Sequence, residues 1–285
     1  MQAHRHDYPI QRMCAVLGVS SSGYYAWCAR PVSSRAQANA ALLTEIRAVY
    51  RTSRQTYGSP RVHADLVARG FSTSKKRVAR LMRAANLRAR QKTKRKVVTT
   101  ESDHAFPVAP NRLNRDFAAQ RPNEKWLTDI TYIPTAEGWL YLAVVMDLFS
   151  RKIVGWAMEA TLASSLVEKA FLMAVANRRT VQGLLHHSDR GSQYAGAPYQ
   201  TQLAVHHIQV SMSRTGNCYD NAPMESFFST LKNEQVHLQD YQTRQEAKTD
   251  IFAYIEGFYN RTRRHSSLGY LSPEEFEREY YKSLS

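Results

Sequence analysis

Three acidic residues, far apart in the sequence, stand where their carboxylates could act on one substrate. Asp129 lies inside the strand-like segment 125–135, where a charge is costly unless another group neutralises it. Asp189 closes the strand-like segment 183–189, and ligand sites of α/β sheets gather at the carboxyl ends of strands. Glu225 stands in the first turn of an expected helix. If these three segments are neighbours in space, the carboxylates converge.

Such a set of carboxylates, without matching cysteine or histidine ligands, favours a hard cation such as Mg²⁺ or Mn²⁺. Two such ions can flank a phosphodiester, one activating the attacking oxygen and the other stabilising the leaving oxygen. The protein then has little to do beyond holding the metals and positioning the nucleic acid. We therefore expect Asp129, Asp189 and Glu225 to be catalytic residues and metal ligands, with two ions when DNA is bound.

Glu225 belongs to the stretch SRTGNCYDNAPMESFFSTLKNE, which predicts a turn followed by an amphipathic helix. Ser229 and Lys232 share a helix face with Glu225, since they follow it by four and seven residues. Lys232 could bind a phosphate near the scissile bond, whereas a solvated surface is the alternative for an isolated Glu–Lys pair. Ser229 is not expected to be a nucleophile, because no neighbour would activate it. The residues expected to face the core are Met224, Phe227, Phe228 and Leu231.

The segments around these residues predict a mixed sheet flanked by helices. Three strands with hairpin-length connections should be antiparallel, and two later strands, each preceded by a helix, should be added in parallel. The first and fourth strands can then be neighbours, with the last helix of the series lying across them. The expected strands are 125–135, 138–149, 151–159, 183–189 and 207–213, and the expected helices include 164–178, 197–206 and 244–259.

The chain is strongly basic: its 285 residues contain 39 Lys and Arg against 24 Asp and Glu, a formal net charge of +15. This balance indicates a polyanionic partner, most commonly nucleic acid. Between positions 75 and 96 stand eleven Lys or Arg residues and no acid, a run that repels itself unless an anion neutralises it. If about six of them touch phosphates, the log–log salt slope of binding should be about −5.

A helix-turn-helix is expected where this run begins. A helix from Ser59 ends at Gly70, and a second, very basic helix begins at Ser74, which is the pattern of a DNA-binding helix-turn-helix. The residues expected to contact DNA from the second helix are Lys75, Lys76, Arg77, Arg80 and Arg83.

Composition and periodicity divide the chain into five parts. Residues 1–35 predict two short helices, which are either half of a helix-turn-helix or an ordinary helical hairpin, and residues 36–96 form the basic helix-turn-helix domain. A linker is expected at 97–121, the catalytic core at 122–240, and a helical, basic extension at 241–285. In the extension, Arg261, Arg263 and Arg264 are expected to touch DNA, although a subunit interface would also suit them.

Other features argue against secretion and against a membrane. The N-terminus has no apolar signal-like region, and no apolar run is long enough to span a bilayer. The three cysteines indicate a reducing, cytoplasmic setting, and the spacing of His4, His6, Cys14 and Cys28 is wrong for a tight zinc site. No basic amphipathic helix with a bulky apolar face is present, so a membrane is not an expected partner.

Polar residues near the carboxylates have simpler explanations. Of His186 and His187, one should point into the core as a packed histidine. Asp147 and Glu159 end two strands and should be solvated or hydrogen-bonded, with a further metal contact as the minor alternative.

The local contexts resemble a known family. They are WLTDITYI around Asp129, HHSDRGSQY around Asp189 and NAPMESFFSTLKNE around Glu225, with 35 residues between the last two acids. This pattern, with Lys232 seven residues after the Glu, resembles the DD(35)E signature of retroviral integrases and bacterial transposases. With LGVSSSGYY, YGSPRVHADL and the terminal YNRTRRHSSLGYLSPEEFE, it resembles the second-frame (OrfB) transposase of the IS-three family of insertion sequences over nearly the whole chain.

The resemblance implies an RNase H-like core that acts as a Mg²⁺-dependent polynucleotidyl transferase on terminal inverted repeats. In that family the enzyme nicks one element end, and the freed 3′-OH attacks the same strand beside the other end, giving a bridged intermediate and then an excised circle before integration into target DNA. It also implies a first-frame (OrfA) product as fusion or partner, a homo-oligomer on DNA, and association with the bacterial nucleoid.

Two other functions fit parts of the sequence. A DNA-binding regulator would keep the fold without catalysis, and an RNase H-type nuclease would use a similar acidic cluster. The intact trio of acids with Lys232 favours catalysis, and the N-terminal DNA-binding region favours a transposase over a general nuclease.

Overall fold

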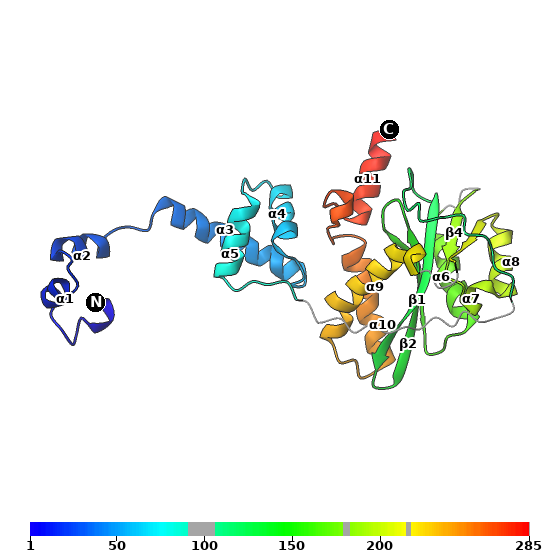
Figure 1. Cartoon of the computed structure of the whole chain (residues 1–285), viewed down its shortest axis with the longest axis horizontal. Coiled ribbons are helices and arrows are strands. Elements are labelled where there is room, and N and C mark those ends of the chain that lie inside the picture. The colour runs from blue at the N-terminus through cyan, green and yellow to red at the C-terminus, as the bar shows by residue number, and fades with distance from the viewer. Residues whose placement is uncertain (91–105, 179–182, 215–217, 285) are drawn as a thin grey trace.

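The structure, a computed structural model, describes residues 1–90, 106–178, 183–214 and 218–284. The chain forms an N-terminal helical pair, a three-helix unit, and a larger α/β part that carries the C-terminal helices (Figure 1). The end of the predicted basic run, at 91–96, and the first part of the predicted linker, at 97–105, lie outside the described residues. Within the described ranges, no helix is both long and apolar enough to cross a membrane.

The N-terminal pair consists of α1 (Ile10–Val16) and α2 (Ser21–Cys28), after a short turn η1 (Gln2–His4). The two predicted helices are present, but large apolar side chains at the end of the first are not buried. Val16 is 81% exposed and Leu17 is 61% exposed, and Cys14 is the one buried residue that α1 contributes. The pair therefore has almost no core of its own.

The three-helix unit consists of α3 (Ser34–Thr52), α4 (Ser59–Ala68) and α5 (Lys75–Ala84). Gly70 adopts φ +87° in the turn between α4 and α5, a conformation that glycine accepts without strain. Ser74 caps α5, since its hydroxyl accepts a hydrogen bond from the Arg77 N–H at 3.3 Å. The unit's interior is small and fully apolar: Ile46, Val49, Val62, Leu66 and Val78 are completely buried.

The α/β part is built on a five-stranded sheet of order β3-β2-β1-β4-β5. The strands are β1 (Lys125–Thr135), β2 (Gly138–Asp147), β3 (Ile153–Glu159), β4 (Leu185–Ser188) and β5 (Gln209–Met212). β1 pairs antiparallel with β2 and β2 with β3, whereas β4 joins β1 and β5 joins β4 in parallel. The predicted mixed sheet, with its first and fourth strands adjacent, is confirmed.

Helices cover both faces of this sheet. One face packs against α6 (Ser164–Asn177), the short α7 (Ser192–Ala195) and α8 (Ala197–Val205), of which α7 was not predicted. At Gly155 of β3 the backbone of α6 comes so close that a Cβ would lie 2.1 Å from the Ala170 carbonyl oxygen. The other face packs against α9 (Ala222–Glu234), which follows the turn η2 (Cys218–Asn221), and against α10 (Arg244–Phe252).

The C-terminal region differs in detail from its prediction. A single helix was expected over 244–259, but α10 gives way to a π-helical segment η4 (Ala253–Tyr259). The turns η3 (Val236–Leu238) and η5 (Ser266–Leu268) and the helix α11 (Pro273–Leu284) complete the extension. In Figure 1 the extension lies between the three-helix unit and the sheet.

The described part of the predicted linker, 106–121, contains no helix or strand, yet it packs firmly against the core. Leu113 is 1% exposed, and its N–H donates to the Ser211 hydroxyl at 3.2 Å. Asp220 accepts hydrogen bonds from the Asn111 amide at 2.8 Å and from the Arg115 guanidinium at 3.2 Å. This segment is thus an irregular part of the α/β unit, which begins before position 122.

Candidate active site

Asp129 lies in the middle of β1, opposite Val144 of β2. Side chains alternate along a strand, so Asp129 shares a face with Leu127 and Ile133, which are buried in the cluster that includes α9. Its carboxylate is partly buried, and Oδ1 accepts a hydrogen bond from the Ile130 N–H at 2.8 Å. The strand therefore presents this acid toward α9.

Asp189 is the first residue after β4. The parallel register pairs Lys125 with Leu185 and Leu127 with His187, and the same offset continued by two residues sets Asp189 beside Asp129. Its Oδ1 accepts a hydrogen bond from the Gly191 N–H at 2.9 Å, which fixes the turn after the strand. The two aspartates thus lie on neighbouring strands at the same level of the sheet.

Glu225 lies in the first turn of α9 and is exposed. The helix is amphipathic as predicted: its buried residues include Met224, Phe227, Phe228 and Leu231, which anchor it over β1. The N-cap is Asn221, whose side-chain nitrogen and oxygen are buried without a hydrogen-bond partner among the described residues.

Electrostatics link the three acids. Burial raises the pKa of the Asp129 carboxyl well above its usual range, and the charges of Asp189 and Glu225 raise it further. The Ile130 N–H and the Lys232 ammonium act in the opposite direction. A buried carboxyl whose ionisation two neighbouring acids disfavour forms a site in which a cation would relieve the repulsion.

The donor chemistry fits a hard divalent ion, because carboxylate oxygens are the ligands that Mg²⁺ and Mn²⁺ prefer. Within the described ranges, however, no three Asp, Glu, His or Cys side chains are already drawn together as a ligand set. The acids Asp129, Asp189 and Glu225 are close enough to influence one another's charge, but they are not closed around a common point.

Lys232 lies two turns after Glu225, on the helix that crosses β1. Its ammonium nitrogen sits 4.8 Å from the centre of the Tyr132 ring, a cation–π contact that fixes the side chain. Partial burial lowers the pKa of Lys232, while Asp129 raises it. The aromatic partner on β1 was not predicted from the sequence.

Both histidines beside Asp189 are buried, although only one was expected to point inward. His186 hydrogen-bonds through Nε2 to the Tyr199 hydroxyl at 2.6 Å, and His187 contacts the Ser211 hydroxyl at 2.8 Å. Burial lowers the pKa of His186 to about 3 and that of His187 to about 4, so both are neutral. They are structural groups behind the site.

The strand-end acids are hydrogen-bonded, as expected. Asp147 accepts hydrogen bonds from the Asn123 N–H at 2.8 Å and the Phe149 N–H at 2.9 Å, and burial raises its pKa to about 6. Glu159 accepts from the Ser165 hydroxyl and pairs with Lys169. Both carboxylates therefore have structural partners.

The basic helix α5 presents most of its cations to solvent. Its exposed basic residues are Lys75, Lys76, Arg80 and Arg83. Arg77 is only partly exposed, and its Nε donates to the Asn39 side chain at 2.9 Å. The inner face is apolar, with Val78 and Met82 buried, so the positive surface expected to meet DNA is present.

The structure corrects the predictions for two arginines of the extension. Arg263 is 4% exposed, and its guanidinium donates to both carboxylate oxygens of Glu234 at 2.7 Å. A phosphate cannot replace this buried pair, so the expectation that Arg263 contacts DNA is wrong. The Arg264 guanidinium also has partners within the protein, because it donates hydrogen bonds to the Tyr270 carbonyl at 2.8 Å and to Asp65 of α4 at 3.4 Å.

Arg264 and its neighbours instead join the three-helix unit to the extension. Arg54 donates to the Gln235 side chain at 2.7 Å, and the Tyr57 hydroxyl accepts from the Arg264 N–H at 2.7 Å. Arg261 differs, since its side chain is 66% exposed and its ion pair with Glu274 is long at 3.7 Å. Contact between Arg261 and DNA stays a prediction.

A five-stranded mixed sheet with acids from β1, the end of β4 and α9 defines the class of integrase-core proteins. A family model described as Integrase core domain matches residues 119–218, and a second of the same description matches 206–273. A model described as HTH-like domain matches residues 37–95, which cover most of α3 and all of α4 and α5.

Relatives cover nearly the whole chain. "Transposase InsF for insertion sequence IS3A" of Escherichia coli (strain K12) is 43% identical over 279 residues, 97% of this chain and 96% of that protein. "Insertion element IS600 uncharacterized 31 kDa protein" of Shigella sonnei is 46% identical over 270 residues, 95% of this chain and 99% of that protein. The chain belongs to the IS3 family of transposases, and the predictions of family, enzyme class and DNA binding are confirmed.

Solved structures include distant neighbours of the α/β part. The catalytic core domain of HTLV-2 integrase in complex with magnesium (trimeric form) has a TM-score of 0.45 at 16% identity, covering 56% of this chain and 99% of that chain. A simian T-cell lymphotropic virus intasome in complex with PP2A regulatory subunit B56 gamma has a TM-score of 0.48 at 16% identity, covering 75% and 69%.

Proposed function

We propose that Asp129, Asp189 and Glu225 form the catalytic centre of this transposase, which cleaves a phosphodiester at an element end and transfers the resulting 3′-OH strand. The observation that carries the proposal is the common electrostatic environment of the three acids, which come from β1, β4 and α9. Burial is the main cause of the raised pKa of Asp129, and the charges of Asp189 and Glu225 add to it, which supports a shared site for the three acids.

The three carboxylates would hold Mg²⁺ or Mn²⁺, two ions once DNA is bound, and these ions would supply charge stabilisation for the attacking and leaving oxygens. The protein's own part is positional. Asp129 is fixed by its strand and Asp189 by the Gly191 N–H, whereas Glu225 is exposed at the start of α9, where it can adjust when DNA arrives. DNA would complete a ligand set that the free protein leaves open.

Lys232 would hold a phosphate beside the reacting one. Its ammonium is already positioned by the Tyr132 ring and lies on the same helix face as Glu225. The salt bridge it would form with a phosphate is charge-assisted, and partial burial strengthens it.

The DNA bound would be the terminal inverted repeats of the element and, later, the target. Basic residues of α5 would contact the repeats: Lys75, Lys76, Arg77, Arg80 and Arg83. The reaction would follow the copy-out–paste-in course of the family, through a circular intermediate, with a first-frame (OrfA) product as fusion or partner. A homo-oligomer would bring two ends together, in the cytoplasm at the nucleoid.

The proposal is tested by incubating the full chain, with and without the first-frame product, with duplexes that carry element ends and Mg²⁺. Joined ends should form with the wild-type chain and be lost in Asp129→Asn, Asp189→Asn and Glu225→Gln. Asp240→Asn, at an exposed acid after η3, is the matched control and should join normally. Unchanged joining in all three site variants would refute the assignment, and hydrolysis without joining would identify a nuclease.

A further inference from the structure

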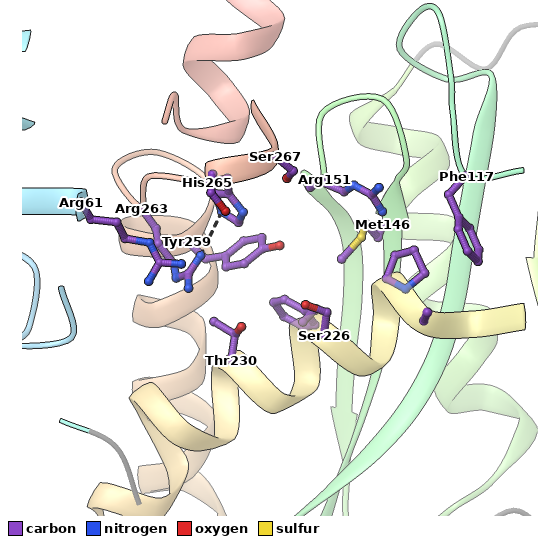
Figure 2. A pocket seen from close by; sticks show the side chains of 14 residues that line it. Arg61, Phe117, Met146, Arg151, Ser226, Thr230, Tyr259, Arg263, His265 and Ser267 are labelled. Carbon is purple, nitrogen blue, oxygen red and sulfur yellow. Dashed lines mark hydrogen bonds between the residues drawn. The ribbon is translucent and has the colours of Figure 1, made fainter. Parts of the chain in front are cut away.

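A second positively charged site lies on another side of α9. It is a cavity of about 350 Å³ between the N-terminal half of α9, the turn after β2, and the C-terminal extension, with one residue from α4 (Figure 2). Its charged and hydroxyl-bearing lining includes Arg61, Arg151, Arg263, Ser226 and Thr230, and no Asp or Glu is among the lining residues. Of its arginines, only Arg263 was named from the sequence, and Arg61 and Arg151 were not.

Arg151 is the key residue of the cavity. It lies in the turn between β2 and β3 and is only partly exposed. Among the residues that the structure describes, it forms no ion pair, and its guanidinium makes no hydrogen bond. A largely desolvated guanidinium without an anion is costly, which indicates that the anion comes from outside the chain.

The backbone at Arg151 adds to this cost. Its φ is +61°, in the left-handed region that favours glycine or asparagine, at about 1 kcal/mol or more for a longer side chain. Figure 2 shows its side chain at the edge of the cavity beside Met146, to the right of Arg61 and Arg263. An arginine kept in a strained turn, partly buried and without an anion among the described residues, is unfavourable unless it binds something.

The other two arginines leave the cavity positive. Glu234 neutralises Arg263 with a close bidentate pair and lies 3.6 Å from Arg61, so one carboxylate faces two guanidinium groups. Arg151 adds a further uncompensated charge. The positive charge of these arginines also affects His265, which lines the cavity: burial, and then the charges of the arginines, lower the pKa of His265 to about 2.

Hydroxyl groups complete the recognition chemistry. Ser226 and Thr230 stand one turn apart on α9 and both line the cavity, and neither hydroxyl has a hydrogen-bond partner among the described residues. Figure 2 shows both side chains on the side of α9 that faces the arginines. Arginine forks and hydroxyl donors together match the oxygens of a phosphate.

We infer that this cavity binds one phosphate of the DNA backbone, held by Arg151 with Ser226 and Thr230 in the positive field of Arg61 and Arg263. Ser226 directly follows Glu225, so the phosphate would lie across α9 from the carboxylates, on the order of 10 Å away given the width of a helix. The strand being cut would thus be gripped on both sides of α9. The choice of DNA as the phosphate source rests on the proposed function.

The first test measures affinity of the full chain for an element-end duplex over a salt series. Arg151→Gln should bind about tenfold more weakly and lower the log–log salt slope by about one, as expected when one phosphate contact is lost. Arg278→Gln is the charge-matched control, since Arg278 is exposed on α11 beside Glu274 and Glu277. An Arg151→Gln chain that behaves like this control overturns the inference.

The second test locates the contact by a neutral methylphosphonate placed at each backbone position in turn. The wild-type chain should lose about tenfold in affinity at one position outside the scissile phosphate, and Arg151→Gln should lose nothing further there. Penalties that add at every position would overturn the inference. In the double variant Ser226→Ala with Thr230→Val, the methylphosphonate at that position should cost less affinity than it does in the wild-type chain. This second variant guards against a folding defect in the Arg151 variant.

Two readouts separate this inference from its rivals. End joining that depends on Asp189, together with unchanged DNA binding by Arg151→Gln, would sink the cavity's role and leave the proposed function standing. Weakened DNA binding by Arg151→Gln, in a protein whose wild-type chain joins no ends, would refute the proposed function and leave the cavity's role standing. An acidic side chain of a second copy is the other possible occupant: a change of oligomeric state by Arg151→Gln without DNA, seen by light scattering, would contradict the phosphate assignment.

Discussion

The ion pair between Arg263 and Glu234 gives a sharp prediction about stability. Glu234 ends α9 and is 8% exposed, and it accepts two hydrogen bonds from Arg263 at 2.7 Å and one from the Tyr254 hydroxyl at 2.8 Å. In Arg263→Met the carboxylate stays buried, with Arg61 at 3.6 Å as its remaining cation. Removal of one partner from a buried pair costs about 3–5 kcal/mol.

Urea unfolding of the full chain at neutral pH measures this cost. Arg263→Met should lose about 3–5 kcal/mol, and Arg263→Lys should recover little, because an ammonium cannot reproduce the two-pronged contact. The double variant Glu234→Gln with Arg263→Met should be more stable than the Arg263 variant alone, since no buried charge is then left without its partner. A stability within about 1 kcal/mol of wild type for Arg263→Met would refute the buried pair and return Arg263 to the surface.

Three further predictions follow from other elements. Replacing Lys76 and Arg80 of α5 by Ala should weaken DNA binding and lower the salt slope by about two, whereas an unaltered slope would exclude phosphate contact there. The folded-state pKa of His186, about 3, lies below its unfolded value of about 6.5, so the stability that the neutral imidazole contributes is complete above pH 6.5 and is lost as the pH falls. His186→Gln should therefore reduce the loss of unfolding free energy between pH 7.5 and pH 5 by about 2 kcal/mol. An identical pH profile of stability in the variant and the wild type would contradict a buried neutral imidazole. Gly155→Ala should destabilise the chain by about 3 kcal/mol or more, because the added Cβ would lie 2.1 Å from the Ala170 carbonyl oxygen. Gly257→Ala, whose added Cβ would meet no atom within 4 Å, should be nearly neutral. Equal unfolding curves for the two variants would refute the close packing of α6 on β3.

The sheet could be predicted from the sequence because its signals are local. The segment 125–135 is rich in apolar and β-branched residues, and β1 has these same bounds. The adjacency of β1 and β4 followed from the order of strands and helices, and it set Asp129 beside Asp189. The helix α9 was predicted by its apolar spacing, which its buried residues confirm.

The misassigned residues depend on partners that local patterns do not reveal. Arg263 stands in a basic surface-like segment, and its partner Glu234 lies 29 residues earlier on another helix. The segment 106–121 has the composition of a linker, but Ser211 and Asp220, about 100 residues later, hold it on the core. Arg151 carries no motif at all, and its role depends on the cavity that α9 and the extension form around it.

In the N-terminal pair the helices could be predicted from the sequence, but the burial of their apolar side chains could not. Both of its helices were predicted, yet large apolar residues there, such as Val16 and Leu17, remain exposed. Periodicity indicates which side chains share a helix face. It does not indicate whether another element covers that face.

The catalytic role of the three carboxylates can be measured best at Glu225, because this residue is exposed and its substitution should not unfold the chain. The measurement is the single-turnover rate of end joining by Glu225→Gln at DNA concentrations that saturate binding, beside Asp240→Asn in the same assay. Glu225→Gln should bind DNA with normal affinity but join ends about a thousandfold or more slowly, on the scale of losing a group that stabilises charge in the transition state. Joining by Glu225→Gln at the rate of the Asp240 control would contradict it.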